Sequence, residues 1–437
     1  MKKGIFYRLF IIISILFIGN SKSYATSKID TLPFKTQYYK DASNQLHIDE
    51  IDKKVFTPVQ SDIFNFGVEN ATFWLKLDAE KDLVFNRNIL LIEQARFLAG
   101  EMYYQKPNKK PQLTKSFNFF KDSAKKGAQG MAYLLPDTIK KGEVLYLKLK
   151  SHEAFITKIS IVNESELHDK YALKDIIFGI YTGVMLIMFV YNLFLFIIVR
   201  DRSYIFYVFY IFFTWLTQIS IQGYGLKYMW HASSPINHYS VVLYSLIGLV
   251  FASLFTTSFL NTKVFAPRIH RLIKIFILLT LANILVLFVA DTYVGFITMQ
   301  LTTVLGVVIA LSSSYYVYFK KHFKPAGFYL IAWSILLIGA VLFILKDYGV
   351  LPYNTFTTYL LQISSAIEVM LLSFALADKI NYFKKENETS QAQALRASLE
   401  NQHLIKEQNI MLEKKVKERT EEIENTNQAL NETLNNL

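Results

Sequence analysis

The sequence contains no cysteine among its 437 residues. This absence excludes disulfide bonds and thiolate metal sites, so each folded part must be stabilised by its own core. A His-Glu-x-x-His zinc motif, a glycine-rich phosphate loop and a nucleophile elbow are also absent. We therefore expect no catalytic residue, no metal site and no cofactor within this sequence.

Acidic residues are fewer than basic ones, at 35 against 47. The surplus is not spread evenly, because residues 26–171 carry 22 basic and 19 acidic side chains and residues 378–437 carry 9 and 11. It lies instead in the first 25 residues and in residues 172–377, beside long apolar stretches. This distribution is typical of charge that flanks membrane spans, so it predicts membrane lipid, and not nucleic acid, as a partner.

The first 25 residues have the pattern of a secretory signal peptide. Lys2, Lys3 and Arg8 precede the apolar core "LFIIISILFIG" (9–19), and small residues lead up to Ala25. The pattern predicts cleavage after Ala25 and export of the chain beyond that residue. An uncleaved membrane helix is the alternative, which the short apolar core disfavours.

Residues 26–171 alternate between apolar and polar side chains, as strands do. The alternation is clearest in "FWLKLDAE" (73–80), "VLYLKLK" (144–150) and "AFITKISIV" (154–162). In the first of these, one face carries Phe73, Leu75 and Leu77, and the other carries Trp74, Lys76 and Asp78. We therefore predict an extracytoplasmic all-β sandwich of jelly-roll-like type, large enough to need no disulfide.

Long apolar stretches fill the middle of the chain. They occupy residues 178–203, 204–221, 240–260, 272–290, 294–319, 325–345 and 355–376. About 20 such residues span a bilayer, and helices buried in a soluble protein would need polar faces that these stretches lack. The sequence therefore predicts a seven-transmembrane domain over residues 172–377.

Basic residues in the loops predict the orientation of the spans. If residue 171 lies outside, nine basic side chains face the cytoplasm and three face the other side. The nine are Arg200, Arg202, Lys263, Arg268, Arg271, Lys274, Lys320, Lys321 and Lys324, and the three are Lys174, Lys227 and Lys346. The positive-inside rule therefore predicts a multi-pass membrane protein with the amino-terminal domain extracytoplasmic and the carboxyl terminus cytoplasmic.

The last segment, residues 378–437, contains neither proline nor glycine. Apolar residues recur there every seven positions, interrupted at the second core position by Arg419, Thr426 and Thr433. The predicted core residues are Leu412, Val416, Ile423, Leu430 and Leu437. This spacing predicts a parallel cytoplasmic coiled coil and hence a homodimer, with a single solvated helix as the alternative.

Glu368 is the one acidic residue well inside a span. A carboxylate in lipid costs on the order of 2.5 kcal/mol or more, so it must be protonated, paired or turned into the bundle. Gln362, Ser364 and Ser365 precede it on the same predicted helix. This polar patch has two interpretations, namely interhelical contacts that hold the bundle together, or a candidate intramembrane switch formed by Glu368, Gln362 and Ser365.

Several of these segments resemble one known family. "FGIYTGVMLIMFVYNLFLFIIVRDRSYIFYVFYIFFTWLTQISIQGYGLKYMW" (178–230) and "SSAIEVMLLSFALADKI" (364–380) resemble the membrane region of the bacterial seven-transmembrane receptors with diverse intracellular signalling modules. "ATFWLKLDAE" (71–80) and "GEVLYLKLKS" (142–151) are similar to the extracellular sensor domain of that family. "LEKKVKERTEEIENTNQAL" (412–430) resembles the helix that joins such receptors to an output domain.

The resemblance implies a signal-transduction receptor that senses an extracytoplasmic ligand and relays the signal through seven helices to a cytoplasmic coiled coil. It also implies the bacterial inner membrane as the location, with the amino-terminal domain periplasmic. The ligand is unknown, and a small carbohydrate is suggested by analogy of fold alone. Members commonly continue into a histidine kinase, a diguanylate cyclase or a DNA-binding domain, whereas this sequence ends at Leu437. The output then has two alternatives: the sensor half of such an enzyme, as in a two-component system, or a receptor that uses a cytoplasmic signalling partner. A transporter is a further alternative for the whole protein.

Overall fold

The computed structural model describes residues 32–59, 61–93, 99–118, 131–151, 153–230 and 236–435. The predicted signal peptide, residues 1–25, and the predicted core residue Leu437 lie outside these residues. The chain forms two compact units, of which one ends at Ser373 and the other begins at Phe374.

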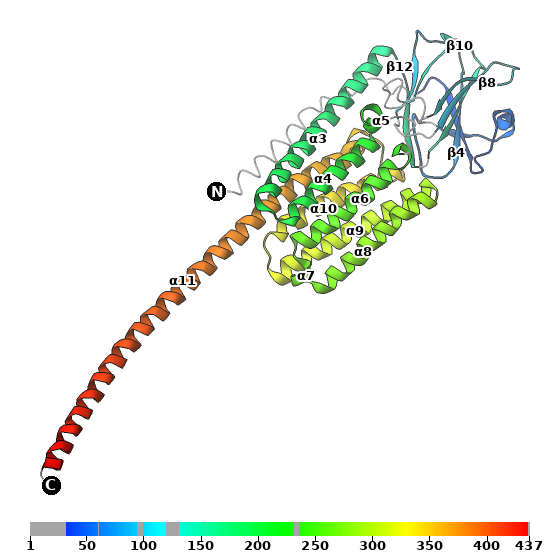
Figure 1. The fold of residues 1–437 in the computed structure, drawn as a ribbon. Coiled ribbons are helices and arrows are strands. Elements are labelled where there is room, and N and C mark those ends of the chain that lie inside the picture. Colours follow the sequence, from blue (N-terminus) through cyan, green and yellow to red (C-terminus); the bar gives the residue numbers. More distant parts are fainter. Residues whose placement is uncertain are drawn as a thin grey trace. The chain divides into compact units, whose positions relative to one another are not determined.

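Strands come first along the chain and helices come after them (Figure 1). The strands are β1 (Lys35–Asp41), β2 (Thr57–Val59), β3 (Ile63–Val68), β4 (Thr72–Asp78), β5 (Leu83–Val84), β6 (Ile89–Ile92), β7 (Ala99–Gln105), β8 (Gln112–Asn118), β9 (Met131–Leu134), β10 (Thr138–Ile139), β11 (Val144–Lys150) and β12 (Ala154–Val162), with a 3-10 helix η1 (Ile48–Lys53) after β1. The helices are α3 (Glu164–Val199), α4 (Arg202–Ile221), α5 (Tyr224–Tyr228), α6 (Ile236–Phe259), α7 (Thr262–Phe265), α8 (Pro267–Val289), α9 (Thr292–Lys321), α10 (Ala326–Asp347) and α11 (Thr355–Asn435).

The strands form antiparallel sheets, in agreement with the predicted all-β domain. Six of them pair in the order β2-β1-β4-β11-β7-β8, four pair in the order β3-β12-β6-β9, and β5 pairs with β10. One apolar core contains residues from both larger sheets, including Phe73 of β4, Leu147 of β11 and Phe155 of β12. The two sheets therefore face each other across a common core, which is the arrangement of a sandwich.

The predicted faces of β4 are confirmed, with one addition. Phe73, Leu75 and Leu77 all lie in the core between the sheets. The opposite face is also covered, because Trp74 and Tyr146 pack with Ile51 of η1 in a second apolar cluster. Alternation in the sequence indicated which side chains share a face, but not that a distant helical turn would cover the outer one.

Within the part of the chain that the structure describes, seven helices are long and apolar enough to cross a membrane, which agrees with the predicted number of spans. They are α3, α4, α6, α8, α9, α10 and the first part of α11. Many of their apolar side chains are exposed, for example Ile187 of α3 and Leu278 of α8. Such side chains are unfavourable in water and favourable in lipid, so their exposure agrees with a membrane-spanning bundle.

The sandwich leads into the first span through a single residue. Asn163 separates β12 from α3 and caps the helix, since its side chain accepts a hydrogen bond from the backbone N–H of Glu166 at 2.8 Å. The Glu166 carboxylate in turn accepts from the backbone N–H of Asn163 at 3.1 Å. This capping box satisfies two N–H groups at the helix start and restricts the angle between strand and helix.

The sandwich also touches the ends of later helices. The Asn65 side chain in β3 donates a hydrogen bond to the backbone carbonyl of Lys346 in α10 at 2.8 Å. Val68 and Ala154 pack in one apolar cluster with side chains of α6, α8 and α9. The sandwich is thus connected to the bundle by contacts as well as by the chain itself.

Helix α11 continues without a break for 81 residues. The absence of proline and glycine from 378–437 explains this continuity, because no residue there interrupts the backbone hydrogen bonds. Every residue from 383 to 431 is exposed, including the predicted core residues Leu412, Val416, Ile423 and Leu430. The coiled coil therefore stays a prediction, whereas the helix itself is present.

Candidate functional site in the membrane-spanning helices

Glu368 lies in the first part of α11 and is fully buried. The Tyr210 hydroxyl of α4 donates a hydrogen bond to Glu368 Oε2 at 3.1 Å. The other carboxyl oxygen, Oε1, has no hydrogen-bond partner within the described residues. This group therefore keeps one unused bonding position inside the bundle.

Further polar contacts tie the same part of α11 to α3 and α4. The Tyr181 and Ser365 hydroxyls lie 3.3 Å apart, and Asn192 Nδ2 donates to Ser373 Oγ at 2.9 Å. The Tyr207 hydroxyl donates to the backbone carbonyl of Val369. Together with the bond between Tyr210 and Glu368, these contacts form a polar network that we call the α11 cluster (Tyr181, Asn192, Tyr207, Tyr210, Ser365, Glu368 and Ser373).

The remaining residues of the predicted polar patch behave differently from one another. Ser364 faces α10 at a close approach, since a Cβ added to Gly339 would lie 2.1 Å from Ser364 Oγ. Gln362 is 3% exposed, and neither of its amide atoms has a hydrogen-bond partner within the described residues. The structure therefore joins Glu368 and Ser365 in the α11 cluster, and leaves Gln362 outside it.

Sequence reasoning found the residues on α11 but missed their partners on the other helices. Tyr207 and Tyr210 stand three residues apart in α4, so they share one helix face. Hydroxyl groups at that spacing, among the large apolar side chains of the first half of α4, are the signal that indicates an inward polar face. Asn192, the one amide of its apolar stretch, carried a similar signal.

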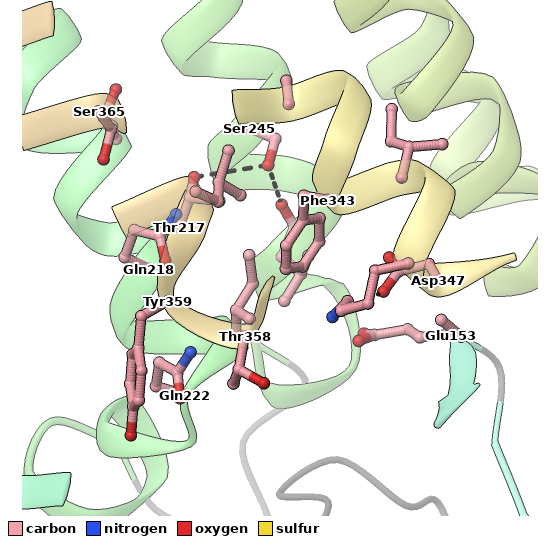
Figure 2. Close-up of a pocket in the computed structure, with 18 of the residues that line it drawn as sticks. Glu153, Thr217, Gln218, Gln222, Ser245, Phe343, Asp347, Thr358, Tyr359 and Ser365 are labelled. Carbon is pink, nitrogen blue, oxygen red and sulfur yellow. Dashed lines mark hydrogen bonds and ion pairs between the residues drawn. The ribbon is translucent and has the colours of Figure 1, made fainter. Parts of the chain in front are cut away.

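A cavity of about 530 Å³ lies beside the α11 cluster. Its walls come from α3, α4, α6, α9, α10 and α11, with a few residues of β6 and of the β12 region (Figure 2). Tyr210 and Ser365 line this cavity and also belong to the α11 cluster. A molecule in the cavity would consequently touch two residues of the polar network.

Charged side chains line the part of the cavity near the sandwich. Lys170 of α3 forms an ion pair with Glu93 at 2.8 Å, and Lys346 forms one with Asp347 at 3.0 Å. Tyr353, in the loop before α11, also lines this part. Burial raises the pKa of the Tyr353 hydroxyl to about 12, with a further contribution from the negative charge of Glu93, so it is a hydrogen-bond donor at neutral pH.

The comparisons with known proteins agree with this architecture. A family model described as "7TM diverse intracellular signalling" matches residues 174–379. A second model, described as "7TMR-DISM extracellular 2", matches residues 35–163. A search of curated proteins found no match.

The first matched region contains most of the cavity walls from α3 to α11 and the whole α11 cluster, and the second contains nearly all of the sandwich. Both models describe parts of one receptor family, namely its membrane region and its extracellular domain. The chain therefore belongs to the bacterial seven-transmembrane receptors with diverse intracellular signalling modules, as a multi-pass membrane protein with an extracellular amino-terminal sensor domain.

Proposed function

We propose that this protein senses an extracytoplasmic ligand and relays the signal through its seven helices to a cytoplasmic helix. One observation carries the proposal: α11 contains Glu368 of the polar network and continues unbroken to Asn435. A helix without a break transmits a rotation or a shift along its axis, because its backbone hydrogen bonds resist bending. A change of packing around Glu368 would therefore reach the carboxyl-terminal segment.

On the sensing side, the joint at Asn163 supports the same proposal. The capping box restricts the angle between β12 and α3, and the ion pair between Lys170 and Glu93 connects the first turns of α3 to the end of β6. A movement of the sandwich on ligand binding would pull on α3. Tyr181 and Asn192 of α3 contact α11 directly, so the movement has a short route to the long helix.

Glu368 has the properties of a switch between packing states. Its Oε1 atom has no hydrogen-bond partner within the described residues, so an alternative partner can be gained without breaking the bond to Tyr210. Hydrogen bonds inside membranes contribute about 0.6–2 kcal/mol. That is too little to unfold the bundle, but it shifts an equilibrium between two states by roughly threefold to thirtyfold.

The test replaces Glu368 in a chimera that carries a known histidine kinase after Leu437. Glu368→Gln keeps the shape and most of the bonding capacity, so we expect near-normal output. Glu368→Leu should insert normally and lock output high or low, read as transcription per receptor on an immunoblot of the membrane fraction. Lower abundance with unchanged output per receptor would mean that Glu368 only holds the helices together.

We propose further that the carboxyl terminus is cytoplasmic in the bacterial inner membrane, supported by the nine-to-three bias of basic residues between the two sides. Alkaline phosphatase fused after Lys170 should be active, and green fluorescent protein fused after Leu437 should fluoresce. An inactive phosphatase fusion, or a stably produced second fusion that stays dark, would contradict this orientation.

A homodimer that pairs through the segment after Phe374 completes the proposal. The exposed apolar residues that recur every seven positions support it, because a second copy can cover an exposed apolar stripe on a helix. The signal would then pass to a cytoplasmic partner or to an output domain.

A further inference from the structure

The cavity in the bundle has the size of a small-molecule site. Its volume of about 530 Å³ falls within the range of roughly 300–1,000 Å³ that ligand pockets occupy. Most of the side chains that line it between the helices are apolar, including Leu336 and Phe343 of α10. An apolar cavity of this size favours a ligand with a substantial apolar part.

Two glutamines line the cavity, namely Gln218 of α4 and Gln222, the residue that follows α4. Gln218 is 3% exposed and Gln222 is 8% exposed, and both are labelled among the lining residues in Figure 2. Neither side chain forms a hydrogen bond with another residue in the described part of the chain. Because these amides line the cavity and use none of their bonding capacity within the described residues, they can pair with a polar group of a bound molecule.

The charges around the cavity restrict the class of that molecule. The charged lining residues are Glu93, Glu153, Lys170, Lys174, Lys346 and Asp347, which are three cations and three anions near the sandwich. Farther in, the polar lining groups are hydroxyls and amides, such as Thr217 and Ser245, whose hydroxyls lie 3.5 Å apart (Figure 2). The cations and anions near the sandwich are equal in number and no charged side chain lines the cavity farther in, so the walls favour neither sign of charge and suit an uncharged ligand.

We propose that the cavity binds a neutral amphipathic molecule, with its hydrogen-bonding head group against Gln218 and Gln222 and its apolar body directed toward Trp333. Along α4, Gln222 lies near the sandwich end and Tyr210 lies three turns deeper, so the apolar body reaches the α11 cluster. This inference rests on the proposed receptor function and assigns a ligand site to the membrane-spanning helices.

A ligand in this position has a direct effect on the polar network. Tyr210 and Ser365 line the deep part of the cavity, and their hydroxyls contact Glu368 and Tyr181. An apolar body that presses on the Tyr210 ring changes the position of the hydroxyl that donates to Glu368. Occupancy of the cavity therefore biases the same two packing states as the substitutions at Glu368.

The test measures binding to the purified full chain in lipid nanodiscs by native mass spectrometry. The probe is 1-decanoylglycerol added from the buffer, compared with decanoate and decyltrimethylammonium, which have similar chains and opposite charges. We expect a saturable one-to-one complex with the neutral probe and none with the charged ones. Absence of a saturable complex, or tighter binding of either charged probe, would overturn the proposal.

Substitutions in the cavity wall test whether the probe binds inside the cavity. Ala340 lines the cavity, so Ala340→Phe should abolish saturable binding, whereas Ala282→Phe on an exposed face of α8 should leave it unchanged. Gln218→Leu and Gln222→Leu should each weaken binding about fivefold, the effect of one lost hydrogen bond. Equal binding by all four variants would mean that the probe associates with lipid alone, and the site would be wrong.

A second arm distinguishes the source of the natural ligand. 1-Oleoylglycerol is placed in the nanodisc bilayer instead of the buffer. Its binding would support the site and indicate a ligand taken from the membrane, whereas binding of the buffer-added probe alone would support the site and indicate a ligand from outside. These measurements need no signalling output, so failure of the relay and failure of the site give different results.

Discussion

The two parts of α11 differ in which side chains they bury and which they expose. The part up to Ser373 buries its polar side chains, including Gln362, Ser365 and Glu368. The part from residue 383 exposes its apolar ones, including Val416 and Ile423. One uninterrupted helix thus hides polar groups at one end and presents apolar groups at the other.

The surroundings explain the difference. In a bilayer, apolar side chains face outward at no cost and polar ones must find partners inside. In water, a stripe of apolar residues with a seven-residue repeat is unfavourable until a second helix covers it. In our proposal, α11 therefore changes its state through contacts inside the bundle and passes this change on through contacts with another copy.

The largest effect is expected in the exposed carboxyl-terminal part of α11. Ile423→Asp places a charge in the predicted seam and should abolish association of the purified full chain, measured by light scattering after detergent extraction. Ile410→Asp is the matched control, because Ile410 is exposed outside the seam. The chain has no cysteine, so a single cysteine at Ile423 should also crosslink far better than one at Glu422. Equal crosslinking at both positions would argue against a defined seam.

A smaller effect is expected where α11 packs on α10. Gly339→Ala would place a Cβ 2.4 Å from Ser364 Cβ, so the helices must separate at a cost of about 1–3 kcal/mol. We expect a lower midpoint when the folded bundle is titrated with sodium dodecyl sulfate.

Two variants check the cause of that loss. Gly339→Ala combined with Ser364→Gly should recover most of the stability, because the clashing side chain is removed. Gly179→Ala makes the same change where no atom lies within 4 Å, and it should have little effect. A combined variant no more stable than Gly339→Ala would exclude the close approach as the cause.

The smallest effect is expected in the buried part of α11, at the hydrogen bond between Tyr210 and Glu368. Tyr210→Phe keeps the ring beside Trp333 and removes the hydroxyl that donates to Glu368. Output of the kinase chimera should shift by roughly threefold, near the lower end of what one intramembrane hydrogen bond contributes. Tyr315→Phe on an exposed face is the control. Unchanged output in Tyr210→Phe would show that this hydrogen bond does not bias the signalling states.

The sequence predicted much of the fold and one side of the candidate site. Seven apolar stretches were enough to count the spans, and alternation was enough to assign the faces of β4. Glu368 and Ser365 were identifiable because polar groups are rare in lipid-spanning segments. Tyr210 and Asn192 carried a weaker signal and were missed, because tyrosine and asparagine also occur at helix positions that contact nothing specific.

By itself the sequence determined the local properties of this protein: which segments are strands, which segments suit a bilayer, and where α11 continues unbroken. These properties arise from the chemistry of neighbouring residues, through hydropathy, periodicity and the absence of helix breakers. Only the tertiary structure decided which helices meet Glu368, and that the surrounding walls enclose a cavity. Helices of almost uniform apolarity can rotate about their axes with little change in hydropathy, so the pairing of Tyr210 with a residue 158 positions away depends on how all the helices pack together.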